Sequence, residues 1–170
     1  LPMPEVTINF KDSIFSNYVT CIEPYVEKNV SFRVTFHEIE HCIMTDDKTG
    51  GFDFKYCDHQ INSEHAEVDF TFTLQTKIFV KFMKMCKGKP FSITFDDNKE
   101  PTKIKIGYKK TKHTISTVTD EYEHFDFEEN ANIVIFTSSQ NLSSILKSMK
   151  TYDDIHFYKK KNEQDITITG

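Results

Sequence analysis

The alternation of hydrophobic and polar residues repeats one order of elements along the chain. Three strand-like stretches, VTINF from Val6, VDFTFTL from Val68 and IVIF from Ile133, recur roughly 62 and 65 residues apart. The strict alternation of the first two stretches and the short apolar run of the third are both typical of β-strands. Each stretch precedes a segment with apolar residues every three to four positions, which indicates an amphipathic helix. Self-similarity at a near-constant period predicts a fold built from repeated units.

The three predicted helices each present one apolar face. They are SIFSNYVTCI from Ser13, TKIFVKFMKMC from Thr76 and SSQNLSSILKSMK from Ser138. The apolar faces comprise Ile14, Phe15, Tyr18, Val19 and Ile22 in the first helix, Ile78, Phe79, Phe82, Met85 and Cys86 in the second, and Leu142, Ile145, Leu146 and Met149 in the third. Because an apolar stripe must be buried, each helix is expected to pack on a sheet through these residues.

Further strand patterns follow every predicted helix. The alternating runs SFRVTF, FSITF and DIHFY come first, and CIM with GFDFKYC, TKIKIGY with HTISTV, and DITITG come next. Turn-forming sequences, DDKTGG, DDNKEP and KKKNEQ, separate them. The unit is therefore a strand, a helix and two or three strands, present twice in full and once in part. This pattern predicts an α+β fold of repeated β-α-β-β(-β) units, with antiparallel sheets and helices on one face.

The repeat also predicts how the chain is divided. We expect a first domain at 1–120, an interdomain linker at 121–131 and the first half of a second domain at 132–170. The linker corresponds to DEYEHFDFEEN, which starts at Asp120, is acidic and lacks a sustained period. An exposed edge strand explains the same stretch equally well.

Lysines line one side of the second predicted helix. Lys77, Lys81 and Lys84 fall within about 60° of one another, from the ~100° turn per residue, and no Asp or Glu lies between them. Like charges at this spacing disfavour an isolated helix by about 0.2–0.5 kcal/mol. A solvated helix face explains these lysines, and so does a surface that meets nucleic-acid phosphates without sequence preference. Equivalent positions hold Ser143, Lys147 and Lys150 in the third helix and Ser13, Asn17 and Thr20 in the first.

Composition narrows the classes of function. The 170 residues carry a net charge of -5, which argues against a protein coated in base but allows a basic face on an acidic body. No apolar run approaches the ~20 residues of a membrane span, so no membrane partner is expected.

The cysteines Cys21, Cys42, Cys57 and Cys86 form no CxxC pair. They are expected to be reduced and buried in an intracellular protein. The basic cluster YKKTKH, from Tyr108, is most simply a solvated hairpin turn.

The segment HEIEH, His37 to His41, matches the H-E-x-x-H pattern of zinc proteases. That pattern needs a helix, on which both histidines share a face. Here it follows a strand-like run, and residues four apart on a strand lie roughly 13 Å from one another. No P-loop, GxGxxG or GxSxG motif occurs. We therefore expect a protein that is not an enzyme and holds no cofactor or metal, and a zinc metalloprotease built on HEIEH is the less favoured alternative.

Several of these segments together resemble the DNA sliding clamps, the family of proliferating cell nuclear antigen. CIMTDDKTGGFDFKYCD resembles a clamp segment that ends in a Gly-Phe-Asp stretch, and VDFTFTLQTKIFVKFMKMCKGKPFSITFDD resembles the second βαβ unit of a clamp domain. KIKIGYKKTKHTISTVTD is most similar to the first domain of a checkpoint-clamp subunit. NANIVIFTSSQNLSSILKSMKTYDDIHFYKKKNEQDITITG resembles the opening unit of a second clamp domain. A clamp subunit has four such units, whereas three are found here.

The resemblance implies a non-catalytic subunit of a nuclear, trimeric DNA clamp that serves DNA replication, DNA repair or the DNA damage checkpoint. Its partners would be duplex DNA, sister clamp subunits and clamp-binding peptides. Channel-lining residues that contact DNA would be Lys77, Lys81, Lys84, Lys147 and Lys150. A peptide groove beside the linker would comprise Met44, Phe52, Phe54, Phe125 and Phe127. Core packing is the alternative for Phe52 and Phe54, and a β-rich interaction module without a DNA role is the alternative for the whole chain.

Overall fold

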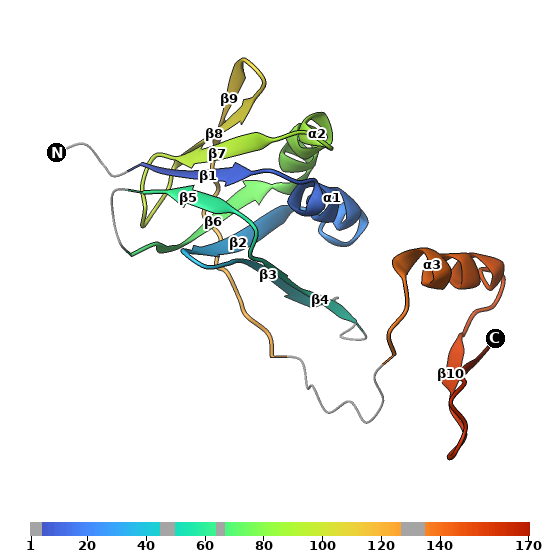
Figure 1. Cartoon of the computed structure of the whole chain (residues 1–170). Helices are drawn as coiled ribbons and strands as arrows, with labels where there is room; N and C mark the ends of the chain where they lie inside the picture. The colour runs from blue at the N-terminus through green and yellow to red at the C-terminus, as the bar shows by residue number, and fades with distance from the viewer. Residues whose placement is uncertain (1–4, 45–49, 64–66, 127–134) are drawn as a thin grey trace. The chain divides into compact units, whose positions relative to one another are not determined.

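The computed structural model describes residues 5–44, 50–63, 67–126 and 135–170. The chain divides into two compact units, Leu1–Phe127 and Glu128–Gly170. This division falls inside the stretch 121–131 that the sequence marks as a linker. The first unit holds both complete repeats, and the second holds the partial one (Figure 1).

The first unit consists of two antiparallel sheets and two α-helices. Its elements are β1 (Val6–Phe10), α1 (Ile14–Cys21), the 3₁₀ helix η1 (Glu23–Tyr25), β2 (Asn29–Thr35), β3 (Ile39–Met44), β4 (Gly51–Tyr56), β5 (Gln60–Asn62), β6 (Asp69–Gln75), α2 (Thr76–Cys86), β7 (Phe91–Phe95), β8 (Lys103–Tyr108) and β9 (Thr111–Ser116). One sheet has the order β5-β1-β7-β8-β9 and the other β4-β3-β2-β6. The helices α1 and α2 lie side by side (Figure 1). The predicted α+β class with antiparallel sheets is confirmed, whereas β5 and η1 were not predicted.

The two repeats exchange their first strands. β1 belongs to the first repeat but pairs with β7 of the second, from Val6–Phe95 to Phe10–Phe91. β6 belongs to the second repeat but pairs with β2 of the first, from Asn29–Gln75 to Thr35–Asp69. Neither sheet is complete without a strand from the other repeat, so the repeats form one interlocked unit.

A single aromatic core is shared by both sheets and both helices. Phe15 of α1 lies at its centre, with ring centroids 4.7 Å from Phe10, 5.4 Å from Phe32 and 6.2 Å from Phe79. Such aromatic pairs add about 0.5–1.5 kcal/mol each beyond the burial of their area. The core therefore fixes the rotation of α1 and α2 and decides which residues these helices expose.

The buried helix faces differ in part from the predicted ones. On α1, Phe15 and Val19 are buried as expected, but Ile14 is 52% exposed. On α2 the buried residues are Thr76, Phe79, Val80, Met83 and Cys86. Ile78 and Met85 are each 38% exposed, so their prediction as core was wrong. Apolar residues span more than one stripe of α2, and the sequence period does not decide which stripe the neighbouring elements cover.

The second unit contains α3 (Ser139–Ser148), β10 (His156–Tyr158) and β11 (Thr167–Thr169), and the two strands pair antiparallel. Ser138 caps α3, because its hydroxyl accepts a hydrogen bond from the Asn141 backbone nitrogen at 3.1 Å. The predicted strand IVIF lies partly outside the described residues, and its last residues, Ile135 and Phe136, are not in a strand. The apolar stripe of α3 is not buried as predicted: Ile145 is 40% exposed and Leu146 36%.

Candidate nucleic-acid interface

Three exposed lysines form a row on α2, which we name the lysine face: Lys77, Lys81 and Lys84. The opposite side of α2 is held by Phe79, Val80 and Met83, which are all at most 1% exposed. Because these anchors fix the rotation of the helix, all three lysines must project to solvent together. The structure therefore brings the predicted residues into one row on one surface.

A carboxylate from a distant segment approaches one end of this row. Glu23 of η1 accepts a hydrogen bond from Lys84 Nζ at 3.0 Å. Lys77 and Lys81 form no ion pair in the part of the chain that the structure describes. The sequence showed no acidic residue between the lysines and gave no signal for Glu23, since the contact depends on how η1 and α2 pack.

The neighbouring helix α1 carries the neutral strip Ser13, Asn17 and Thr20. These side chains bond within their own helix: Asn17 Nδ2 donates to Ser13 Oγ at 3.4 Å, and Thr20 Oγ1 donates to the Asn17 carbonyl at 2.8 Å. They are half-buried, so they add polarity but no charge to the surface beside the lysine face. The positive charge of this surface comes from α2.

In the second unit, Lys147 and Lys150 are exposed, as expected. Both line a surface hollow of about 470 Å³ together with Leu142 and Leu146. Lys147 and Lys150 belong to the second compact unit, whereas the lysine face belongs to the first. A role for Lys147 and Lys150 on DNA stays a prediction.

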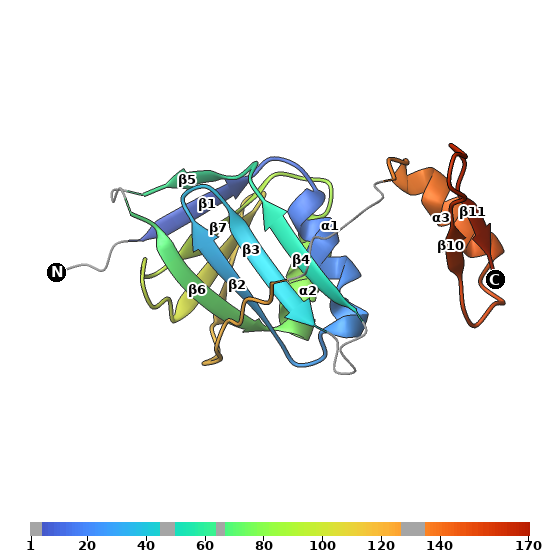
Figure 2. The ribbon, with the colours of Figure 1, turned by 90° about the horizontal axis from the view of Figure 1, so that it is seen from below.

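The segment after β9 crosses the outer face of the four-stranded sheet, where Figure 2 shows it in orange. Val118 donates its backbone N–H to the Thr73 carbonyl at 3.0 Å, and Asn29 Nδ2 donates to Asp120 Oδ2 at 3.4 Å. Further along, the Phe125 backbone N–H donates to Cys42 Sγ at 3.3 Å. Burial raises the pKa of the Cys42 thiol. The segment is thus a strap over the sheet and not an edge strand in the residues described.

Phe52 and Phe54, which were predicted for a groove beside the linker, lie on the face of β4 that the linker does not cross. Phe54 stacks on Tyr18 of α1 with ring centroids 3.7 Å apart, and Phe52 lies 5.2 Å from Tyr25. Both therefore face the helices, whereas Cys42, opposite Asp53 in the register, faces the linker. Alternate residues of a strand point to opposite faces, so Phe52 and Phe54 cannot join a surface on the linker side. Phe54 packs against the hydrophobic core, as in its alternative assignment, and Phe52 packs on the ring of Tyr25.

The other groove residues lie elsewhere. Phe125 is half-buried in the strap, and Phe127 lies outside the described residues. Met44 lines a surface hollow of about 490 Å³ with Ile43, Tyr25 and Asp120. Met44 is therefore the one predicted groove residue, among those described, that borders a hollow next to the start of the linker.

The HEIEH segment does not form the helix that a zinc protease needs. His37 lies exposed in the turn after β2, whereas His41 lies in β3 and is 3% exposed. His41 Nδ1 forms a hydrogen bond with the Tyr18 hydroxyl at 2.5 Å, and burial lowers the pKa of His41 to about 4. One histidine is thus in solvent and the other is a packing residue. Within the described ranges, no group of three metal-ligating side chains gathers.

Two further observations bear on the class of protein. No helix among the described residues is long and apolar enough to cross a membrane. All four cysteines are free, but Cys21 and Cys57 are exposed, so the expectation that all four are buried was wrong for these two.

Comparisons with known proteins support the fold. No protein-family model and no curated protein sequence matches the chain. PCNA from Thermococcus kodakaraensis has a similar structure, with a TM-score of 0.62 and 12% identity over 96% of this chain and 72% of that one. DNA polymerase III subunit beta from Borrelia burgdorferi, solved with a natural product, is similar with a TM-score of 0.56 and 10% identity over 69% of this chain. The match covers only 31% of that longer bacterial chain.

At these identities the likeness is one of fold. This chain has the sliding-clamp fold that the sequence resemblance implied. The closer resemblance to a checkpoint-clamp subunit stays a prediction.

Proposed function

We propose that this chain is a non-catalytic sliding-clamp subunit that contacts duplex DNA and tethers replication, repair or checkpoint factors in the nucleus. The observation that carries the proposal is the lysine face, which projects from a clamp-fold unit with net negative charge elsewhere. Ammonium groups meet backbone phosphates regardless of base sequence, and their contribution to affinity falls steeply with salt.

The edges of the sheets support a proposed assembly with sister subunits. β9 ends the five-stranded sheet and β4 ends the four-stranded sheet. An edge strand offers unpaired backbone groups to a strand of another chain, which is how sheets extend across subunits. We infer that such pairing closes a ring of three subunits around the duplex.

Partner peptides would dock at the hollow beside Met44. Its wall includes the apolar side chains of Ile43 and Val26 and the ring of Tyr25, which is 59% exposed. An exposed aromatic ring beside aliphatic side chains is the composition of a peptide-anchoring site. Of the five residues predicted for this groove, Met44 is the one among the described residues that lines this hollow.

The test replaces Lys77, Lys81 and Lys84 together with Gln. A matched control replaces Lys28, Lys55 and Lys99, which are exposed and lie outside the lysine face, so that the net charge changes equally. Binding to a fluorescein-labelled duplex is followed by fluorescence anisotropy at several salt concentrations. The lysine-face variant should bind more weakly and lower the slope of log affinity against log salt by about 2 to 3, since each lost phosphate contact is worth about 0.9. Equal behaviour of the two variants would remove the basis of the DNA-binding proposal.

Sedimentation of the chain, alone and with candidate sister subunits, tests the ring. Association into a defined oligomer supports a clamp subunit. Monomeric behaviour with every candidate, together with unchanged DNA binding of the lysine-face variant, would instead indicate an interaction module without a DNA role.

A further inference from the structure

The outer face of the five-stranded sheet is free of carboxylates over its described strands. The register places Asn9, Ser92, Gly107 and Lys112 in one row across β1, β7, β8 and β9. Their neighbours along each strand, such as Ile8 and Ile93, are 1% exposed and belong to the core. The outward positions of this sheet carry Lys103, Lys105 and Lys112, and otherwise Ser, Thr, Asn, Gln or Gly. We name this surface the basic sheet face.

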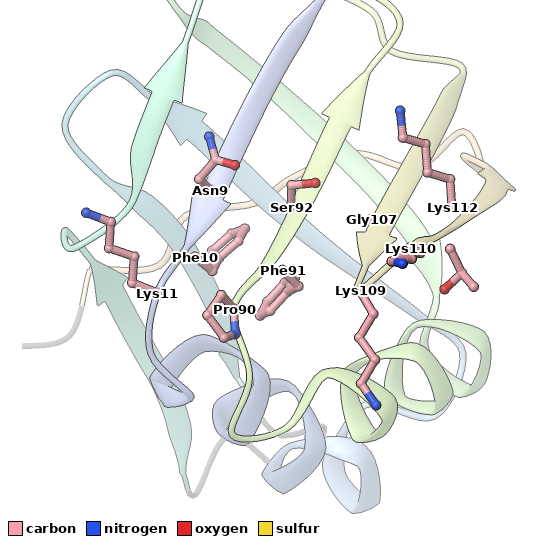
Figure 3. Close-up of a pocket in the computed structure, with 11 residues that line it drawn as sticks. Asn9, Phe10, Lys11, Pro90, Phe91, Ser92, Gly107, Lys109, Lys110 and Lys112 are labelled. Atoms are coloured by element: carbon pink, nitrogen blue, oxygen red, sulfur yellow. The ribbon is translucent and has the colours of Figure 1, made fainter.

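A hollow of about 430 Å³ lies at the end of this face, near the β8–β9 turn (Figure 3). In Figure 3, Lys11 and Lys112 stand on opposite sides of Asn9 and Ser92. Lys109 and Lys110 of the turn complete the positive wall. The hollow exists partly because residue 107 is glycine: a Cβ at this position would lie 2.6 Å from Ser92 Oγ.

Of the polar groups that line the hollow, Lys109 lies over the Tyr108 ring and Thr111 donates a hydrogen bond to the Tyr108 carbonyl, but five others have no internal partner among the described residues. Lys11, Lys110 and Lys112 form no ion pair with any residue that the structure describes. The side chains of Asn9 and Ser92 form no hydrogen bond within the same described ranges. The hollow thus offers three ammonium groups, an amide and a hydroxyl as free donors to an anion.

The composition of this surface favours nucleic acid over an acidic protein. Lys, Ser, Thr, Asn and Gln are the side chains that make most contacts to phosphates. Protein interfaces, in contrast, are depleted in Lys and Ser at their centres and depend on buried aromatic anchors. The aromatic residues under the hollow, Phe10 and Phe91, are only 1% and 5% exposed and cannot act as anchors.

The basic sheet face is distinct from the lysine face. His113 of β9 contacts Phe82 of α2, with ring centroids 5.0 Å apart. Its neighbours on the strand, Lys112 and Thr114, therefore point away from α2. The two basic surfaces lie on opposite sides of this sheet, so one straight duplex on the lysine face does not occupy both.

We propose that the basic sheet face is a second binding surface for the sugar-phosphate backbone of nucleic acid, without sequence preference. It goes beyond the function proposed above, because it neither uses the lysine face nor requires a closed ring. Such a surface would hold a strand or duplex on the outside of the clamp-fold unit.

The experiment uses the full chain with Lys11, Lys110 and Lys112 replaced by Gln. Lys109 is left in place because its φ of 54° makes its backbone sensitive to substitution. The Lys28, Lys55 and Lys99 variant is again the control of equal charge. With the same labelled duplex and with a labelled single strand, the sheet-face variant should lower affinity and the salt slope by about 2 to 3 relative to the control. Combined with the lysine-face variant, its effect should add, since the sites do not share groups.

Two outcomes overturn this proposal. One is a sheet-face variant that binds both probes as the control does. The other is binding of a labelled polyglutamate peptide that depends on Lys11, Lys110 and Lys112 while DNA binding does not, which would assign the surface to an acidic protein. If only the lysine-face variant loses affinity for DNA, the proposed function is supported and this inference is overturned. If only the sheet-face variant loses affinity for DNA, this inference is supported and the proposed role of the lysine face is overturned.

Amine acetylation followed by mass spectrometry gives a reading that needs no variant. Duplex DNA should protect Lys11, Lys110 and Lys112 of the native chain from acetylation, and Lys28, Lys55 and Lys99 should react equally with and without DNA. Absence of protection at the first three would contradict the proposal even if the variants failed to fold.

Discussion

Lys84 of α2 and Glu23 of η1 form an ion pair with 3.0 Å between Nζ and Oε2, although 61 residues separate them in the sequence. Both side chains are accessible, at 58% and 39% exposure. The third lysine of the lysine face is therefore shared between the protein's own carboxylate and any incoming phosphate. If the lysine face binds DNA as proposed, Glu23 competes with DNA for Lys84, whereas Lys77 and Lys81 have no such competitor among the described residues.

Replacing Glu23 with Gln should strengthen binding to duplex DNA. The change frees Lys84 and removes one negative charge beside the lysine face. Exposed ion pairs are worth about 0–1 kcal/mol, so the gain should be at most about fivefold. Anisotropy titration at low salt measures it. Glu27→Gln is the matched control, because Glu27 is exposed, close in sequence and unpaired in the described chain. An equal gain in affinity for this control would mean that the change in net charge, and not the release of Lys84, strengthens binding.

His41 should make stability depend on pH. Burial lowers its pKa from 6.5 to about 4, so the unfolded chain takes up a proton before the folded one does. Stability from the neutral imidazole is complete above pH 6.5 and is lost as the pH falls toward about 4. Between about pH 7 and pH 4.5 the free energy of unfolding should fall by about 2 to 3 kcal/mol from this group, at about 1.4 kcal/mol per pKa unit.

The measurement is urea unfolding at both pH values, for the native chain and for His41→Gln. Glutamine does not titrate, so the variant should show a smaller decrease on acidification, and the difference between the chains isolates His41. Parallel decreases in the two proteins would show that carboxylates alone cause the loss of stability.

The strands were predictable from the sequence where one face of each is buried. β1, β7 and β8 alternate strictly, and the structure buries the apolar positions of all three. Which strands pair was not predictable, because β1 joins β7 across 80 residues of sequence and the alternation is the same for any partner. The exchange of β1 and β6 between the sheets is a tertiary feature without a local signal.

The candidate site was predictable to a similar extent. Helical spacing predicted that Lys77, Lys81 and Lys84 lie in one exposed row. The structure agrees, because the buried residues Phe79 and Met83 occupy the opposite side of α2. The basic sheet face was missed because Lys11 and Lys112 are distant in sequence and come to line the same hollow only through the pairing of β1, β7, β8 and β9. The YKKTKH cluster was recognised as a turn, but a turn pattern does not reveal the strand that lies beside it.

The cysteines should differ in reactivity on the native protein. Cys21 and Cys57 are exposed, whereas Cys42 and Cys86 are buried, and burial raises the pKa of Cys86 to about 11. Only thiolates react with iodoacetamide, so Cys21 and Cys57 should be modified first and the buried pair only after unfolding. Peptide mass spectrometry over time measures each rate. Fast modification of Cys86 in the native state would contradict the packing of α2 described above.

Phe79 and Ile78 are neighbours on α2 whose substitution should have very different costs. Phe79 is fully buried, with its ring 5.9 Å from Phe32 and 6.4 Å from Phe72, whereas Ile78 is 38% exposed. Phe79→Ala should lower the free energy of unfolding by about 3–5 kcal/mol because it leaves a cavity, and Ile78→Ala should cost less than about 2 kcal/mol. Urea unfolding compares them, and the milder Phe79→Leu keeps the comparison measurable if Phe79→Ala does not fold. Equal losses at the two positions would contradict the orientation of α2 that buries Phe79 and exposes the lysine face.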